Sequence, residues 1–562
     1  MSRDLLEGLL AQLLERVLRE RLRLPNEALA KIKSYLLEVP KEESFGDIST
    51  SVALKLASIL KKPPREIAQE LTACLNQEIP QSDLSNLIEK IDIAGAGFVN
   101  FHLSLEYLYS LLKEITRPKD FPLSYPKKHK KVLVEFVSAN PTGPLSVAHG
   151  RQAVVGDALS NILEFLGYDV TREYYLNDWG NQINILGNSI YLRLKELQGE
   201  KIEFPEDHYQ GEYIIDLARE LLGAPEAGAT ARFIAPTAPE DCRQHGVKRI
   251  LEIIRAELKD FRVSFDSWFS QAELEKSGNI DTAISFLKEK GFIYQQEGAT
   301  WFSSTKFGDD KGRVVVKSDG SYTYLAPDIA YHQDKFKRGY DWLINLWGPD
   351  HHGYIPRLKA AVEALGRPRS ALDVIIVQLA TLRKEGQVVS MSTRKGEYIT
   401  LREVIEEVGV DAARYFFVMR KTDSHLDFDL ELAKKQSSEN PVYYIQYAHA
   451  RISNILANSG VPLDRLPEAD PTLLKEKEEL ELLKRIAKFE HNLKVVELQL
   501  DPYCLTVYLQ ELAESFHRFY DAHRVLVDDI PLKSSRLYLI LGCKNIISLG
   551  LKLLGVQAPE KM

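Results

Sequence analysis

The stretch from Val134 to Asp157 carries the most suggestive set of polar side chains in this sequence. It reads as a buried strand over Val132–Phe136, a turn rich in proline and glycine, and a helix that opens near His149. In an open α/β sheet, ligands bind at the carboxyl ends of strands, and helix N-termini attract phosphate. A histidine at such a helix start can donate to a phosphate oxygen. A plain strand–loop–helix unit with an incidental histidine explains this stretch equally well.

Two further segments hold residues that could meet a nucleotide. Residues 345–353 follow a strand, where Asp350 could accept from a ribose hydroxyl and Gly348 would let a ligand approach the backbone. Residues 389–396 form a small, hydroxyl-rich, basic loop that could close over a triphosphate and neutralise charge. A turn without a ligand and a merely solvated loop are the respective alternatives.

One pair of residues could hold a cationic substrate. Tyr324 and Asp328 are four residues apart, so they share one face if the segment is helical. The alternative is a helix N-cap. The adjacent His351 and His352 make a poor metal-ligand pair, because neighbouring side chains point in different directions. The sequence also has no P-loop motif.

The composition is that of an ordinary globular protein. The chain has 562 residues, of which 44% are apolar and 27% charged. Its net charge of −8 neither indicates nor excludes a polyanionic partner, because binding depends on local basic patches. No signal peptide or membrane-length apolar run occurs, and the four cysteines lie far apart without a Cys-x-x-Cys motif. We therefore expect a cytoplasmic protein without membrane contact, disulfides or bound zinc.

The element pattern predicts three domains. Residues 1–115 start with leucines at helical spacing and end with a strand–turn–strand signal at 91–103, which indicates a small α+β domain. Residues 116–400 alternate strands and helices, as a Rossmann-like, doubly wound parallel sheet does, apart from a helix-rich insertion at about 190–300. Residues 401–562 are nearly all helical and predict a C-terminal bundle.

Four short apolar runs are the expected strands of the parallel sheet. A helix between the first two runs should end near Gly167. The runs are Val132–Phe136, Val170–Leu176, Trp342–Trp347 and Val374–Leu379.

The order of these pieces resembles that of class I aminoacyl-tRNA synthetases, and specifically the arginyl-tRNA synthetase family. The first family signature, His-x-Gly-His preceded by Glu-Phe-x-Ser-x-Asn-Pro, maps onto residues 135–149. The Asp-Trp-Gly-x-Gln loop matches 178–182, and Tyr-x-x-x-Asp-Ile-Ala matches 324–330. The second signature, Lys-Met-Ser-Lys-Ser/Arg, maps onto 390–394. Segments near both chain ends resemble the family's N-terminal tRNA-contacting domain and its helical anticodon-binding domain, so the resemblance covers essentially the whole chain.

The resemblance implies roles for particular residues. The arginine pocket would comprise Glu135, Ser138, Asn140, Tyr324 and Asp328. The ATP-binding residues would be Ser146, Ala148, His149, Gly348, Asp350 and Met391. Catalytic roles would fall to Ser146, His149, Ser392 and Arg394. The tRNA-contacting residues would include Phe45, Asp47, Asn100, Tyr447 and Arg451.

The implied reaction has two steps, arginyl-adenylate formation from ATP and transfer to the terminal ribose of tRNA(Arg). Mg²⁺ would accompany ATP without an all-protein cage, and the protein would act as a monomer.

Two departures from the family pattern keep other functions open. Ser146 and Ala148 replace the first histidine and the glycine of the first signature. Ser390 and Thr393 stand where the second signature carries lysines, and Arg394 or Lys395 would compensate. The alternatives are a tRNA- or arginine-binding paralogue that has lost activation, and a synthetase for another amino acid.

Overall fold

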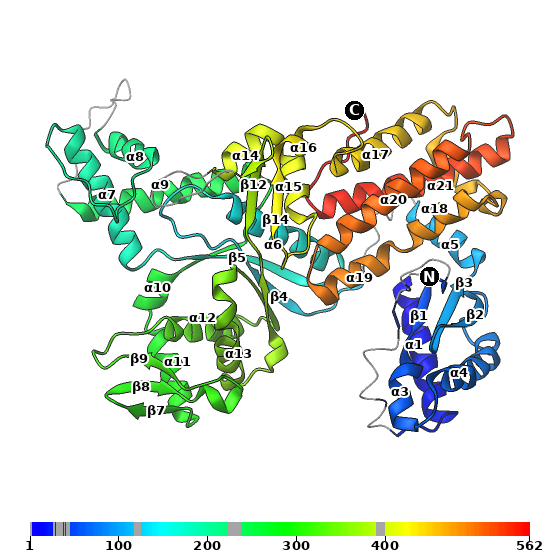
Figure 1. Ribbon diagram of the computed structural model, residues 1–562, viewed down its shortest axis with the longest axis horizontal. Coiled ribbons are helices and arrows are strands. Elements are labelled where there is room, and N and C mark those ends of the chain that lie inside the picture. The colour runs from blue at the N-terminus through cyan, green and yellow to red at the C-terminus, as the bar shows by residue number, and fades with distance from the viewer. Residues whose placement is uncertain are drawn as a thin grey trace.

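The computed structural model describes residues 3–25, 29, 37–38, 40, 45–116, 125–222, 238–388 and 399–562. Figure 1 shows an elongated molecule with the parallel sheet at its centre, a helical bundle at upper right and a small blue domain at lower right. Within the described residues, no helix is long and apolar enough to cross a membrane.

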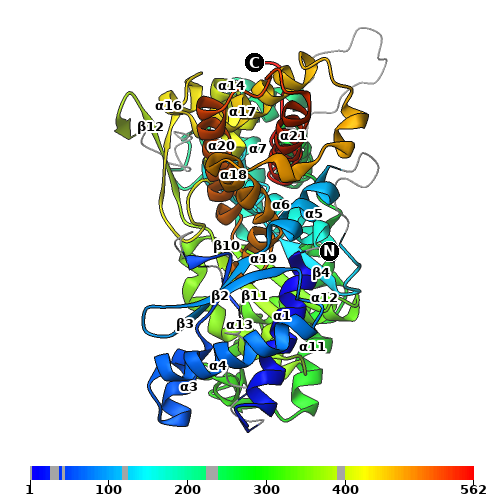
Figure 2. The same ribbon diagram turned by 90° about the vertical axis from the view of Figure 1, so that its right-hand side faces the viewer.

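The N-terminal part is a three-stranded antiparallel sheet packed on helices. Its strand order is β1-β3-β2, so the strand–turn–strand predicted at 91–103 is present as β2 and β3. The elements are α1 (Arg3–Glu20), β1 (Ile48–Thr50), α3 (Val52–Leu60), α4 (Pro64–Glu78), η3 (Ile79–Gln81), β2 (Ile88–Ala94), β3 (Phe98–Leu103) and α5 (Leu105–Ile115). Helix α5 packs against the C-terminal bundle, where the Tyr109 hydroxyl donates to the Leu474 carbonyl oxygen at 3.2 Å. Figure 2 shows the small domain below that bundle.

The central part contains a five-stranded parallel sheet in the order β11-β10-β4-β5-β6. The predicted α/β fold class is confirmed. Its first half comprises β4 (Lys131–Glu135), α6 (Val147–Phe165), β5 (Asp169–Leu176), α7 (Asn181–Leu197), α8 (Glu212–Leu222), α9 (Pro239–Asp260), β6 (Ser267–Ser270), α10 (Gln271–Lys276) and α11 (Asn279–Glu289). Its second half comprises β7 (Ile293–Gln296), β8 (Ala299–Phe302), η4 (Ser304–Phe307), β9 (Arg313–Val316), α12 (Leu325–Lys337), β10 (Trp342–Trp347), η5 (Pro349–Tyr354), α13 (Ile355–Ala364), η6 (Arg369–Ala371), β11 (Leu372–Ile376), β12 (Ala380–Lys384) and β13 (Gln387–Val388).

Two expectations about this sheet need correction. The region 190–300 is helix-rich, yet it also supplies β6, which pairs with β5 at the sheet edge. Four half-buried residues give too weak an apolar signal to be recognised as a strand. The last strand spans Leu372–Ile376 rather than Val374–Leu379, because Gln378 leaves the sheet and its N–H donates to Thr422 O at 3.0 Å.

Helices α6 and α12 cover opposite faces of the parallel sheet. Gly156 lets α6 approach the sheet closely, since a Cβ there would lie 2.2 Å from Phe136. On the other face, α12 brings Tyr331 and Lys335 onto Glu173 and Glu135 of the central strands. Helix α6 ends at Phe165, two residues before the predicted stop at Gly167, whose φ is +90°.

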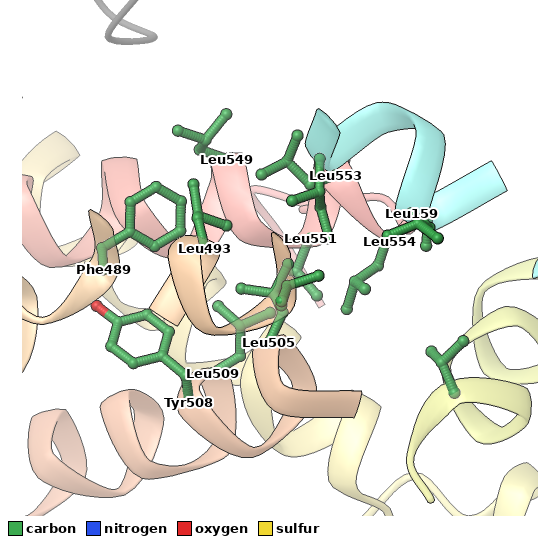
Figure 3. Packing of buried hydrophobic residues seen from close by; sticks show 14 of the residues in the cluster. Leu159, Phe489, Leu493, Leu505, Tyr508, Leu509, Leu549, Leu551, Leu553 and Leu554 are labelled. Atoms are coloured by element: carbon green, nitrogen blue, oxygen red, sulfur yellow. The ribbon is translucent and has the colours of Figure 1, made fainter. Parts of the chain in front are cut away.

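The C-terminal part is almost entirely helical, as predicted, apart from β14, which pairs in parallel with β12. Its elements are α14 (Leu401–Val408), α15 (Val410–Val418), β14 (Leu426–Asp429), α16 (Leu430–Lys434), α17 (Pro441–Ala457), η7 (Leu463–Glu468), η8 (Pro471–Leu473), α18 (Lys477–Ala487), α19 (Phe489–Gln499), α20 (Tyr503–Ala522) and α21 (Ile530–Leu553). Figure 3 shows buried leucines of α19, α20 and α21 meeting Leu159 of α6, so one apolar core continues from the sheet into the bundle.

Candidate functional site

The candidate site lies at the carboxyl edge of the parallel sheet, where the strand order reverses. From β4 the chain proceeds to β5 and β6 on one side, then returns to β10 and β11 on the other. Connections that leave in opposite directions open a crevice between the central strands. Glu135 at the end of β4 pairs in register with Asn345 of β10. The fold therefore brings the predicted segments around Glu135 and Gly348 to the same edge.

The turn after β4 has a strained backbone. Val137 and Ser138 have left-handed φ values of 65° and 43°, which a β-branched residue such as valine rarely adopts. Each such residue costs about 1–3 kcal/mol and persists where its surroundings enforce it. The Tyr175 N–H donates to Ser138 Oγ at 3.1 Å, and that Oγ lies 3.5 Å from Glu135 Oε1. The turn thus directs the predicted ligand Ser138 back toward Glu135.

A cavity of about 350 Å³ lies beside this turn. Asn140, Ser146 and His149, all predicted site residues, line it. Gln182, from the predicted Asp-Trp-Gly-x-Gln loop, also lines it and accepts from Asn140 Nδ2 at 2.5 Å. The first signature and this loop therefore form one recess.

His149 is held as a neutral donor at the start of α6. Its Nδ1 accepts the Ser146 backbone N–H at 3.1 Å, which fixes the N-terminal turn of the helix. Burial lowers the pKa of His149 from 6.5 to about 4, so the ring is neutral at physiological pH. Because Nδ1 accepts, the ring proton resides on Nε2. An Nε2–H at a helix N-terminus in a cavity is suited to donate to a phosphate oxygen.

Glu135 is buried against a cation of the protein itself. The Lys335 ammonium lies 2.5 Å from Glu135 Oε2, and the lysine side chain is fully buried. The neighbouring Glu173 pairs in register with Glu135 and is bound by Arg338 and by the Tyr331 hydroxyl. Two of the carboxylates at this edge are therefore already balanced by cations.

Asp328 differs from these two carboxylates. Its Oδ2 accepts the Tyr354 hydroxyl at 2.6 Å, but among the described residues it forms no ion pair. Burial and the nearby Glu135 charge outweigh the Tyr354 hydrogen bond and the charges of Lys335 and His351, and they raise the pKa of Asp328 to about 6. Asp328 is half-buried, and the protein around it removes much of its hydration. This combination is expected for a side chain that lines a recess. Asp328 is thus a desolvated carboxylate that lacks a cation.

Tyr324 does not share the environment of Asp328. It is 88% exposed at the start of α12, and the phenol that contacts Asp328 belongs to Tyr354. Tyr324 has helical φ and ψ, and the Asp328 N–H donates to its carbonyl oxygen at 3.4 Å, so the two residues stand in one helical turn as their spacing predicts, but their side chains differ in exposure. An arginine-binding role for Tyr324 stays a prediction.

Sequence reasoning missed the α12 residues that support the carboxylates. These residues recur at helical spacing on the face toward the sheet, and that spacing was the available signal. They are Tyr331, His332, Lys335 and Arg338.

The remaining predicted ATP-binding residues lie at the same edge or outside the described residues. Ala148 lies in the first turn of α6, and Gly348 directly follows β10. The side chain of Asp350 is exposed and contacts His351 at 3.4 Å. Met391, Ser392 and Arg394 lie outside the described residues.

Two predicted tRNA-contacting residues are buried in the N-terminal sheet. Asp47 accepts the Leu103 N–H at 2.9 Å, and Asn100 accepts from Ser49 Oγ at 2.7 Å. They are 5% and 1% exposed and bonded within the sheet, and a contact of either residue with tRNA stays a prediction. Phe45, by contrast, is 41% exposed and available to a partner.

Tyr447 and Arg451 belong to an exposed aromatic cluster on α17 and α20. Tyr447 stacks on Tyr443 and on His517, with ring centroids 6.2 and 6.1 Å apart. The Arg451 guanidinium lies over Tyr447 at 4.6 Å and over Tyr520 at 4.7 Å. Stacked aromatics beside an arginine form a platform on which unpaired bases can stack.

Within the described residues, no group of three or more His, Cys, Asp or Glu side chains is arranged to hold a metal ion.

Three family models match the chain in succession. The arginyl-tRNA synthetase N-terminal domain matches residues 7–103, the catalytic domain of class I tRNA synthetases (R) matches 119–456, and the DALR anticodon-binding domain matches 445–562. The catalytic model continues into the predicted C-terminal domain. The boundaries at 115 and 400 therefore stay predictions.

The parallel sheet, the cavity at its switch point and the catalytic-domain match define a class I aminoacyl-tRNA synthetase. An arginine–tRNA ligase of Desulfosudis oleivorans is 47% identical over 94% of both chains, and one of Geobacter sp. strain M21 is 48% identical over 94% of both. The chain belongs to the arginyl-tRNA synthetase family. The solved structure of Thermus thermophilus arginyl-tRNA synthetase covers 100% of both chains with a TM-score of 0.75 at 23% identity, and this likeness concerns the fold.

Proposed function

We propose that this protein attaches arginine to tRNA(Arg) in two ATP-dependent steps. In the first step, the arginine carboxylate attacks the α-phosphorus of ATP, so that arginyl-adenylate forms and pyrophosphate leaves. In the second step, the terminal ribose of the tRNA takes the arginyl group and AMP leaves. Membership of a family whose relatives are named arginine–tRNA ligase supports this activity.

The environment of Asp328 is the single observation that supports arginine as the substrate. A half-buried carboxylate without an ion pair among the described residues is energetically unfavourable unless a cation joins it. A guanidinium supplies a planar array of charged donors that suits a carboxylate. A site that lacks one positive charge at the switch point therefore favours arginine over a neutral amino acid.

The other pocket residues would orient the substrate. Ser138 and Glu135 lie next to each other at the end of β4 and offer further acceptors to the guanidinium. Asn140, which lines the cavity with Gln182, is placed to meet the α-amino group or the carboxylate region. This arrangement would direct the arginine carboxylate toward His149.

ATP would bind along the first turn of α6, with its adenosine near Gly348 and Asp350. His149 would donate from Nε2 to the phosphates, while Ser146 holds the ring and Ala148 flanks it. For phosphoryl displacement a protein mainly positions groups and stabilises charge. Met391, Ser392 and Arg394 of the second signature would complete the nucleotide site. Mg²⁺ would enter with ATP and neutralise charge on its phosphates.

The tRNA would contact both ends of the molecule, through Phe45 and through the aromatic cluster at Tyr447 and Arg451. We further propose that the protein acts as a cytoplasmic monomer.

The decisive experiment is charging of defined tRNA isoacceptors with labelled arginine, with lysine and citrulline as competitors. Charging with arginine is expected, together with ATP–pyrophosphate exchange that requires arginine and appears only when tRNA is added. Tight tRNA binding without any charging would instead identify a non-catalytic paralogue. Preference for an uncharged amino acid would overturn the arginine assignment.

A further inference from the structure

A lysine without any assigned role lies beneath the proposed arginine pocket. Lys335 extends from α12 to the carboxyl edge of the sheet and is fully buried. Its ammonium lies 2.5 Å from Glu135 Oε2, 3.2 Å from Asn345 Oδ1 and 4.1 Å from the centre of the Tyr331 ring. A buried ammonium is tolerated only when such partners replace its water.

A chain of hydrogen bonds fixes the orientation of this lysine's partners. His332 Nδ1 lies 2.8 Å from the Asp328 carbonyl oxygen, and His332 Nε2 lies 3.0 Å from Asn345 Nδ2. Burial holds the pKa of His332 well below its ordinary value, so the ring is neutral and carries one proton. The carbonyl can only accept, so Nδ1 donates to it and Nε2 accepts from Asn345. The amide oxygen of Asn345 must then face Lys335.

Lys335 also makes the two pocket carboxylates, Glu135 and Asp328, unequal in charge balance. Glu135 already raises the pKa of Asp328, which shows that the two acids interact. Lys335 forms its ion pair with Glu135, and its charge also lowers the pKa of Asp328, whose own hydrogen-bond partner is the neutral Tyr354 hydroxyl. The protein thus neutralises one carboxylate internally and leaves the other for a ligand.

We propose that Lys335 is a positioning and specificity-determining residue for arginine. It fixes the Glu135 carboxylate and balances its charge, so that the pocket lacks one positive charge and accepts one guanidinium. This inference rests on the proposed function. Without Lys335, the uncompensated Glu135 charge and the loss of the lysine charge would both raise the pKa of Asp328, so that this carboxyl would hold a proton near neutral pH. That proton would compete with the guanidinium, so arginine binding would weaken at neutral pH and recover as the pH rises.

The test compares wild type, Lys335→Met, Glu135→Gln and the double variant Lys335→Met/Glu135→Gln. Aminoacylation is measured from pH 6 to 9, with KM determined separately for arginine and for ATP. For Lys335→Met we expect the arginine KM at pH 7 to rise about 10- to 100-fold, as for a shift of one to two pKa units, and to fall toward high pH. The ATP KM should change less than about twofold, since Lys335 contacts the proposed arginine side of the site.

The double variant tests whether Lys335 acts through Glu135. With Glu135 uncharged, removal of the lysine should shift the pH profile less than it does in Lys335→Met, because only the direct effect of the lysine charge on Asp328 remains. Lys337→Met is the matched control, because Lys337 is exposed on the same helix and its ammonium donates to Gln333 on that helix. Circular dichroism and thermal unfolding verify the fold, and Lys335→Arg, which keeps the charge, should retain the wild-type pH profile even if its KM rises.

An unchanged arginine KM and pH profile in Lys335→Met would overturn the proposal. Equal losses for arginine and ATP would do the same, because they would indicate general structural damage. In both cases wild-type charging with arginine would leave the proposed function intact. Wild type that charges no tRNA with arginine would instead refute the proposed function itself.

Discussion

The carboxyl edge of the parallel sheet and the N-terminal sheet both carry the polar residues of family motifs, but they use them differently. In the N-terminal sheet, Asp47 and Asn100 are buried and satisfied by Leu103 and Ser49. At the parallel sheet, Asp328 is desolvated and still lacks a cation among the described residues. We therefore expect a motif residue to bind a ligand where the fold leaves its bonding capacity incomplete.

Replacement of Asp328 should produce the largest effect. Asp328→Ala strands a bound guanidinium without its charged partner, which costs about 3–5 kcal/mol for a buried pair. We expect the arginine KM to rise at least 100-fold while the ATP KM changes little, as measured in steady-state aminoacylation. Asp319→Asn, in an exposed turn, is the matched control. Equal rises in the KM for arginine and for ATP would show that Asp328 has a structural role, like the buried polar residues of the N-terminal sheet.

Replacement of His149 should affect the chemical step rather than arginine affinity. His149→Ala removes the Nε2–H donor proposed for the phosphates, and loss of one such preorganised donor costs about 10²–10³ in rate. Single-turnover adenylate formation should fall by that factor. An unchanged single-turnover rate would argue against contact between His149 and ATP.

The aromatic cluster should affect tRNA alone. Tyr447→Ala removes a stacking surface worth about 1–3 kcal/mol per base. The KM for tRNA should rise about fivefold or more, with arginine and ATP constants unchanged. Leu463→Ala, an exposed apolar residue elsewhere in the bundle, serves as the control. A change in the arginine KM would show that this cluster is coupled to the catalytic edge.

The pH dependence of arginine binding should report the ionisation of Asp328. Its pKa of about 6 means that the carboxylate is charged at pH 7 and protonated at pH 5. Protonation removes the partner of the guanidinium, so the arginine KM should rise about tenfold as the pH falls from 7 to 5. The neutral His149 should not contribute in this range, because its pKa is about 4. A flat profile between pH 5 and 7 would contradict the assignment of Asp328.

The smallest effects are expected in the N-terminal sheet, where a buried residue and an exposed residue should behave differently. Asn100→Ala removes the acceptor of the buried Ser49 hydroxyl and one of the donors to Asp92, and it should lower the free energy of unfolding by about 1–3 kcal/mol. Phe45→Ala, at an exposed position, should keep the stability and raise the tRNA KM. Thermal unfolding and tRNA titration measure the two effects. A tRNA-specific defect in Asn100→Ala with unaltered stability would instead support its predicted contact with tRNA.

The sequence by itself determined the family, the fold class and the central strands, because these depend on local apolar runs and on motif order. The strands around Val132 and Trp342 were predictable since each is a short buried run between turn residues. Strand β6 was not, because a half-buried edge strand has no comparable pattern.

Only the tertiary structure decided which polar residues are available to a ligand. It placed Tyr354 rather than Tyr324 against Asp328, and it paired Glu135 with Lys335, a residue 200 positions away. Spacing along a helix predicts which residues share a face, but not which partner the opposite element supplies. Burial and charge balance arise from contacts between distant segments, so they exist only once the chain has folded.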